Sequence, residues 1–161
     1  PSWAEQDPND WWDALGKSVR KAISDSGISV DQIAAMAVDT TCCSVVPLDD
    51  SGNPVRPALI WMDVRSAEQA EQMVATEDDA LRINSNGSGP VSAEWMIPKA
   101  LWIKQNEPEI FERAVTICEY QDYINLHLTG RLGASINNVS TRWHCDYSRE
   151  GVPNRYWKNL I

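Results

Sequence analysis

Three separated groups of polar and aromatic side chains could bind a small polyhydroxylated ligand. The first group, Asp39-Thr40-Thr41-Cys42, follows an apolar run that is typical of a buried strand. Ligands of open α/β sheets gather at the carboxyl ends of strands, where a carboxylate and short hydroxyls can hydrogen-bond vicinal hydroxyl groups. The alternative is structural, since Thr is a good strand residue and a buried Cys behaves as a small hydrophobe.

The second group places Trp61, Asp63 and Arg65 at alternate positions. Tryptophan offers a large apolar face and one N–H donor, and Asp63 is an acceptor for hydroxyls. Arg65 could orient Asp63 through a charge-assisted ion pair. The alternative interpretation puts Trp61 in the core and makes Asp63 the N-cap of the helix that contains Arg65. Both interpretations can hold for Asp63, because a capping carboxylate keeps a second oxygen for a ligand.

The third candidate is Glu94, in the first turn of a predicted helix, where an acid also complements the helix dipole. Lys99 is interpreted as structural, with its stem packed beside Trp102. The sequence His144-Cys145-Asp146 does not predict a metal site, because consecutive side chains point in different directions and no partner pair has ligand spacing. His127 is assigned no chemical role.

Alternating strand and helix patterns must position these residues. A helix is predicted from Pro8, capped by Asp7, to a stop at Ser26-Gly27. Further helices are expected over residues 65–74, 78–83, 92–105, 108–114 and 122–128. Strands are expected over residues 33–38, 44–48, 58–61 and 115–118, with a turn at 49–54 and a loop at 84–89. This alternation predicts an α/β layered domain, and the tail from Trp143 fits no pattern.

Composition limits the classes of function. The chain has 161 residues, 43% of them hydrophobic, and a formal net charge of −9, so one globular domain is expected. The negative charge argues against a nucleic-acid partner, and no apolar run is long enough to span a membrane. Four cysteines without a disulfide framework favour a reducing cytoplasm.

Five segments, in order along residues 2 to 150, resemble the FGGY family of carbohydrate kinases. They are residues 2–12, 33–48, 58–65, 91–109 and 120–130. The combination of Ser92-Ala93-Glu94 with Pro98-Lys99 is most similar to the ribulokinase branch. The resemblance implies an α/β fold, part of a ribonuclease H-like (actin-like ATPase) domain, with a mixed sheet flanked by helices.

The resemblance also implies an activity, the ATP-dependent phosphorylation of a terminal hydroxyl on a pentulose or related polyol, with ATP and Mg²⁺ as cofactors. Trp61 would form a wall for the carbon chain of the sugar. The expected sugar-binding residues are Thr40, Thr41, Cys42, Trp61, Asp63, Arg65 and Glu94. Met96 replaces a residue that is small or carries a hydroxyl in the family, so ribulose, xylulose, xylitol and erythritol all stay open.

Residues 1–161 would then form part of an N-terminal sugar-binding domain. The opening phosphate-binding meander, the aspartate base and the second, ATP-binding domain would lie outside them. Residues 86–89 do not replace the phosphate-binding meander, because they lack the Lys and Ser/Thr of a P-loop. Without that meander and the base, this chain is expected to hold no catalytic residue and to be inactive alone. Unpaired strand edges favour pairing with another chain, for example in a homodimer. The alternatives are a non-catalytic sugar-binding or scaffold protein of the same fold, and an ATPase that binds a protein.

Overall fold

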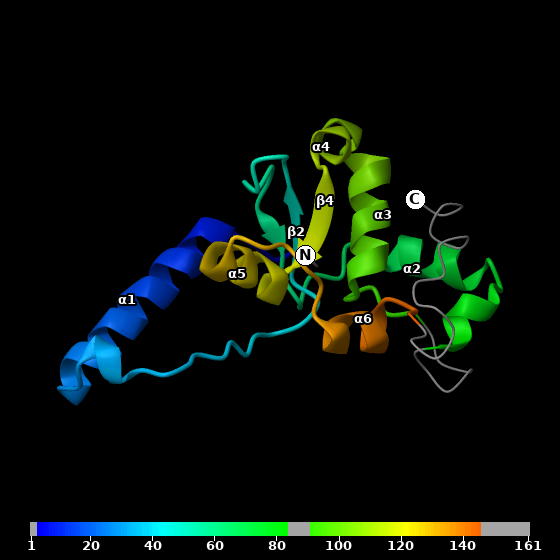
Figure 1. Ribbon diagram of the computed structural model, residues 1–161. Coiled ribbons are helices and arrows are strands. Elements are labelled where there is room, and N and C mark those ends of the chain that lie inside the picture. Colours follow the sequence, from blue (N-terminus) through cyan, green and yellow to red (C-terminus); the bar gives the residue numbers. More distant parts are fainter. Residues whose placement is uncertain (1–2, 84–90, 146–161) are drawn as a thin grey trace.

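A computed structural model describes residues 3–83 and 91–145 (Figure 1). Among these residues the strands are β1 (Glu5–Gln6), β2 (Val45–Leu48), β3 (Ala58–Leu59) and β4 (Thr116–Glu119). The helices are α1 (Pro8–Ser26), α2 (Ala67–Val74), α3 (Met96–Asn106), α4 (Pro108–Arg113), α5 (Tyr120–Thr129) and α6 (Ile136–Arg142). Short 3-10 turns occupy Val30–Gln32 and Asp79–Arg82.

The strands form a small sheet in the order β1-β3-β2-β4. Within the described residues every strand pairing is antiparallel, where a mixed sheet was expected. The longest pairing joins β2 to β4, from Val45 opposite Glu119 to Leu48 opposite Thr116. Because β2 runs against its two neighbours, its beginning lies beside the ends of β3 and β4. That end of the sheet positions the candidate site.

Helices cover both faces of the sheet. Successive side chains of a strand point to opposite faces. Val45 accordingly packs in one cluster with α2 and α3, where Met73, Ile97 and Leu101 are buried. Val46 packs in a second cluster with residues of α1 and α5, including Tyr123. Pro98 does not kink α3, because it lies in the first turn, where its missing N–H has no intrahelical partner.

The first helix confirms the prediction at both ends. The side chain of Asp7 accepts a hydrogen bond of 2.9 Å from the amide N of Asn9, and Gly27 ends the helix at a φ of 67°. Glycine takes this left-handed conformation without the steric cost of a Cβ atom. Beyond its first turns, where Pro8 and Trp11 are buried, α1 extends away from the sheet (Figure 1).

The strand predicted over residues 33–38 is wrong. These residues take no regular structure, and the side chains of Ile33 and Met36 are exposed. A strand needs a hydrogen-bonding partner, and within the part of the chain that the structure describes none pairs with this run. β2 is already paired on both edges. The apolar composition of this run therefore predicted neither its burial nor its pairing.

The second half of the chain follows the predictions more closely, with boundary shifts of a few residues. The strand predicted at 115–118 is β4, and the helix predicted at 122–128 is α5, which ends at Gly130 with a φ of 68°. β1 and α6 were not predicted. The loop predicted at 84–89 and the chain beyond Cys145 lie outside the described residues. None of the helices that the structure describes has the length and apolar character needed to cross a membrane.

Candidate functional site

A pocket of about 370 Å³ lies at the end of the sheet where β2 begins and β3 and β4 end. Its volume lies within the range of about 300–1,000 Å³ that is common for small-molecule sites. The structure brings five of the predicted site residues together here, from three separate segments. The lining residues are Thr40, Thr41, Cys42, Cys43, Trp61, Glu94 and Arg142.

Trp61 is not a core residue, since its side chain is 45% exposed. Its backbone N–H donates to the hydroxyl of Ser44 at 3.1 Å, which fixes the chain beside the start of β2. The preceding amide, of Ile60, donates to the carbonyl of Ala4 at 3.1 Å. A held backbone with an exposed indole suits stacking on the C–H face of a ligand.

The bend at Cys42 and Cys43 forms a second wall of the pocket. Cys43 has a φ of 64°, in the left-handed region that costs a residue with a Cβ atom free energy. Two buried charged side chains hold it there: its N–H donates to Glu119 Oε2 at 2.9 Å, and its carbonyl accepts from Lys99 Nζ at 2.8 Å. Burial raises the pKa of the Cys43 thiol, so this sulfur stays protonated at neutral pH.

Glu119 is a buried carboxylate that the sequence analysis missed. Besides the Cys43 amide, it accepts a hydrogen bond of 2.9 Å from the indole N–H of Trp143. Burial raises the pKa of Glu119, and these two hydrogen bonds oppose the rise without cancelling it. A charged residue directly after the apolar residues of a strand was the signal that could have identified it, as for Asp39.

Lys99 is fully buried, as its structural interpretation requires, but its head group has specific partners that were not predicted. Its Nζ donates to the carbonyls of Cys43 and Ile60, each at 2.8 Å. Burial lowers the pKa of Lys99 to about 8, against the opposing influence of nearby acidic groups.

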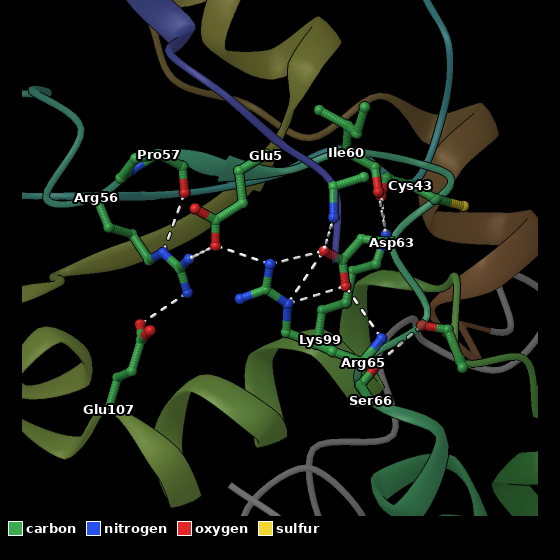
Figure 2. A network of polar contacts seen from close by, with 12 residues as sticks. Glu5, Cys43, Arg56, Pro57, Ile60, Asp63, Arg65, Ser66, Lys99 and Glu107 are labelled. Atoms are coloured by element: carbon green, nitrogen blue, oxygen red, sulfur yellow. Dashed lines mark hydrogen bonds and ion pairs between the residues drawn. The ribbon is translucent and has the colours of Figure 1, made fainter. Parts of the chain in front are cut away.

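Asp63 and Arg65 differ from the expectation, because both are buried and neither is among the residues that line the pocket. Asp63 is 0% exposed, and its carboxylate accepts from the amides of Ala4 at 2.6 Å and Arg65 at 3.0 Å. Arg65 does pair with Asp63, at 2.7 Å, and also with Glu5 at 2.7 Å (Figure 2). The N-cap of α2 is Ser66 and not Asp63.

The ion pair of Asp63 and Arg65 is enclosed by aromatic rings. The Arg65 guanidinium lies 4.0 Å from the ring centroid of Trp3 and 4.9 Å from that of Trp102. Burial raises the pKa of Asp63, but the hydrogen bonds from Arg65 and Ala4 outweigh it and leave the pKa below its usual range. The carboxylate is therefore ionised and committed to contacts within the protein.

Arg142 lines the pocket, although the sequence analysis did not select it. It ends α6, a helix of seven residues rich in Asn, Ser, Thr and Val, which are weak helix formers. No sequence signal therefore placed it near the bend. Because Arg142 is a donor and Glu94 is an acceptor, the pocket can bind ligand hydroxyls that accept a hydrogen bond and ligand hydroxyls that donate one. Among residues 3–83 and 91–145, no group of three His, Cys, Asp or Glu side chains could hold a metal ion.

Comparison with known proteins identifies relatives along the whole chain. Residues 1–150 match the model of the FGGY family of carbohydrate kinases, N-terminal domain. A xylulose kinase of Streptomyces coelicolor is 36% identical over 140 residues, which cover 86% of this chain and 28% of that protein. A ribulokinase of Shouchella clausii is 29% identical over 168 residues, which cover 95% of this chain and 29% of that protein.

Solved structures agree with the family match. A xylulose kinase from Rhodospirillum rubrum aligns with a TM-score of 0.77 at 27% identity, covering 98% of this chain and 33% of that one. A Plasmodium falciparum glycerol kinase, at 21% identity and a TM-score of 0.77, supports the fold alone. The chain thus spans about a third or less of the length of these relatives. It belongs to the FGGY family of carbohydrate kinases, as part of an N-terminal domain with the actin-like ATPase fold.

Proposed function

We propose that the protein transfers a phosphoryl group from ATP to a hydroxyl of a pentulose or related polyol, and that this chain provides the sugar pocket. The observation that carries the proposal is the pocket itself. It combines the exposed indole of Trp61 with the carboxylate of Glu94 and two threonine hydroxyls, in a chain of the carbohydrate kinase family.

Each lining group suits a polyol. The indole face of Trp61 offers stacking area to C–H groups, and the hydroxyls of Thr40 and Thr41 can both donate and accept. Glu94 accepts from ligand hydroxyls, and Arg142 donates to them. Phosphoryl transfer depends mainly on in-line placement of the attacking hydroxyl, so the contribution of this chain is to orient the substrate.

ATP would supply the phosphoryl group, and Mg²⁺ would neutralise charge on the phosphates. The described residues do not fit the metal, because the pocket lining contains a single carboxylate, that of Glu94. We therefore assign nucleotide and metal binding, and the catalytic base, to other parts of the protein. All four cysteines are free thiols, which suits a reducing compartment such as the cytoplasm.

The test measures ADP release by the complete protein, in a coupled assay, with a panel of ribulose, xylulose, xylitol and erythritol. We expect sugar-dependent turnover with at least one of them. Trp61→Ala should raise KM for that sugar about tenfold or more, because the stacking wall is lost. Trp12→Ala, the same substitution at a tryptophan that packs against His127, is the control and should leave KM unchanged.

Two other outcomes separate the alternatives. Sugar binding in calorimetry without any ADP release would support a non-catalytic sugar-binding protein instead. A complete protein that shows no binding and no turnover with any sugar of the panel would overturn the proposal.

A further inference from the structure

The two walls of the pocket lie outside regular secondary structure. Residues 40–43 precede β2, and Trp61 follows β3. β2 pairs with β3 at Val45 and Leu59, next to the point where the chains diverge toward the pocket. The ladder therefore ends two residues after Cys43 and two residues before Trp61, so contacts beyond it must hold the two walls at their spacing.

Two side chains bridge the walls directly beyond the ladder. Lys99, which α3 delivers from below the sheet, donates from Nζ to the carbonyls of Cys43 and Ile60 at 2.8 Å each (Figure 2). The hydroxyl of Ser44 accepts from the amide of Trp61 at 3.1 Å. Both side chains are buried, and neither lines the pocket. The Ser44 bond joins the segment of one wall directly to the segment of the other. The two Lys99 bonds join both segments to helix α3.

We propose that Lys99 and Ser44 are positioning residues of the pocket, which hold the wall at Cys42 and Cys43 at a fixed spacing from Trp61. Affinity for the sugar then depends on two side chains that do not touch it. The inference rests on the proposed function, because it assigns the pocket to the sugar.

Burying the lysine ammonium at this position is unfavourable for folding. Removing an ammonium group from water costs free energy that a methionine of similar length would not incur. The cost is offset by the two hydrogen bonds that the head group donates. One goes to the carbonyl of Cys43, and the other goes to the carbonyl of Ile60, which also accepts from the amide of Asp63 at 2.9 Å. The carboxylates of Asp63, Glu119 and Glu94 are close enough to favour the charged form of this ammonium. Glu94 lines the pocket, so the positive charge also acts on a residue that meets the ligand.

The test uses Lys99→Met in the complete protein, which keeps the apolar stem and removes the donors. We expect KM for the preferred sugar to rise about tenfold, while kcat and KM for ATP stay within about twofold. Ser44→Ala removes the other bridge and should raise the same KM in the same direction. Direct sugar titration, followed by tryptophan fluorescence, should give a dissociation constant that rises in parallel.

Met73→Ala is the control for a purely structural effect. Met73 is fully buried in α2 and does not line the pocket, so this variant lowers thermal stability without altering the walls. Lost stability reduces the folded fraction and hence the apparent kcat, but it leaves KM unchanged. A rise in KM with Lys99→Met and not with Met73→Ala separates positioning from stability.

Lys99→Met and Ser44→Ala variants that bind sugar as tightly as the wild type overturn this inference alone. If Lys99→Met does not fold, Ser44→Ala decides by the same criterion. A wild-type protein that binds none of the sugars overturns the proposed function together with the inference.

Discussion

Replacing Asp63 with alanine would remove one partner of a buried ion pair. In the folded protein the Asp63 carboxylate accepts from the Ala4 amide at 2.6 Å and pairs with Arg65 at 2.7 Å. Asp63→Ala would leave the Arg65 guanidinium buried between Trp3 and Trp102, with Glu5 as its remaining acidic partner. The Ala4 amide, which lies next to β1, would lose its acceptor.

The magnitude follows from these contacts. Removing one member of a buried ion pair typically costs about 3–5 kcal/mol of unfolding free energy, because the other charge stays buried without compensation. Arg65 keeps Glu5 at 2.7 Å, which places the expected loss toward the lower end, about 3 kcal/mol. That is a large part of the about 5–15 kcal/mol that stabilises a typical domain.

The assay is urea unfolding followed by tryptophan fluorescence, compared between wild type, Asp63→Ala and Asp25→Ala. Asp25 pairs with Lys21 at 2.7 Å on the exposed surface of α1, so its removal should not shift the midpoint. An Asp63→Ala protein as stable as Asp25→Ala, but with a strongly raised KM for sugar, would refute the structural role. It would restore the first interpretation, in which Asp63 binds the ligand.

Three further predictions follow from burial and backbone conformation. Lys99 has a pKa of about 8 in the folded protein against an ordinary 10.5, so the unfolded chain binds more protons between these pH values. The unfolding free energy of the wild type should therefore rise with pH in this range, relative to that of Lys99→Met. Urea titrations at pH 7 to 10.5 measure the difference. Iodoacetamide should modify Cys42 but not Cys118, whose pKa burial raises, and sugar should protect Cys42, as read by peptide mass spectrometry. Gly27→Ala should lower the unfolding free energy by about 1 kcal/mol, because φ is 67° at this position, and the melting temperature should fall accordingly. Gly133→Ala should leave the melting temperature unchanged.

Local signals predicted the elements whose ends are defined by nearby residues. Helix α1 begins at Pro8, directly after its N-cap Asp7, and ends at its C-cap Gly27, and Gly130 ends α5. These ends were predictable because a capping residue acts on backbone groups only a few residues away. Strand pairing is not local, which explains the error at residues 33–38. Their apolar run carries no information on whether a neighbouring strand is present to pair with them.

The same distinction applies to the pocket. Residue type and family resemblance selected five residues that the structure brings together in the pocket: Thr40, Thr41, Cys42, Trp61 and Glu94. The side-chain direction of Asp63 was not predictable, because the Ala4 amide that draws it inward lies 59 residues earlier in the chain. Arg142 was missed for a related reason, because its place in the pocket depends on where distant segments meet. Glu119 follows the apolar residues of a strand, but its partners, the Cys43 amide and the Trp143 indole, lie in other segments.

The measurement that tests the central claim most directly is a crystal structure of the complete protein with its preferred sugar bound. The account predicts the sugar between the indole of Trp61 and the bend at Cys42, with ligand hydroxyls within hydrogen-bonding distance of Glu94. A sugar bound at another place, with this pocket left to solvent, would contradict the account.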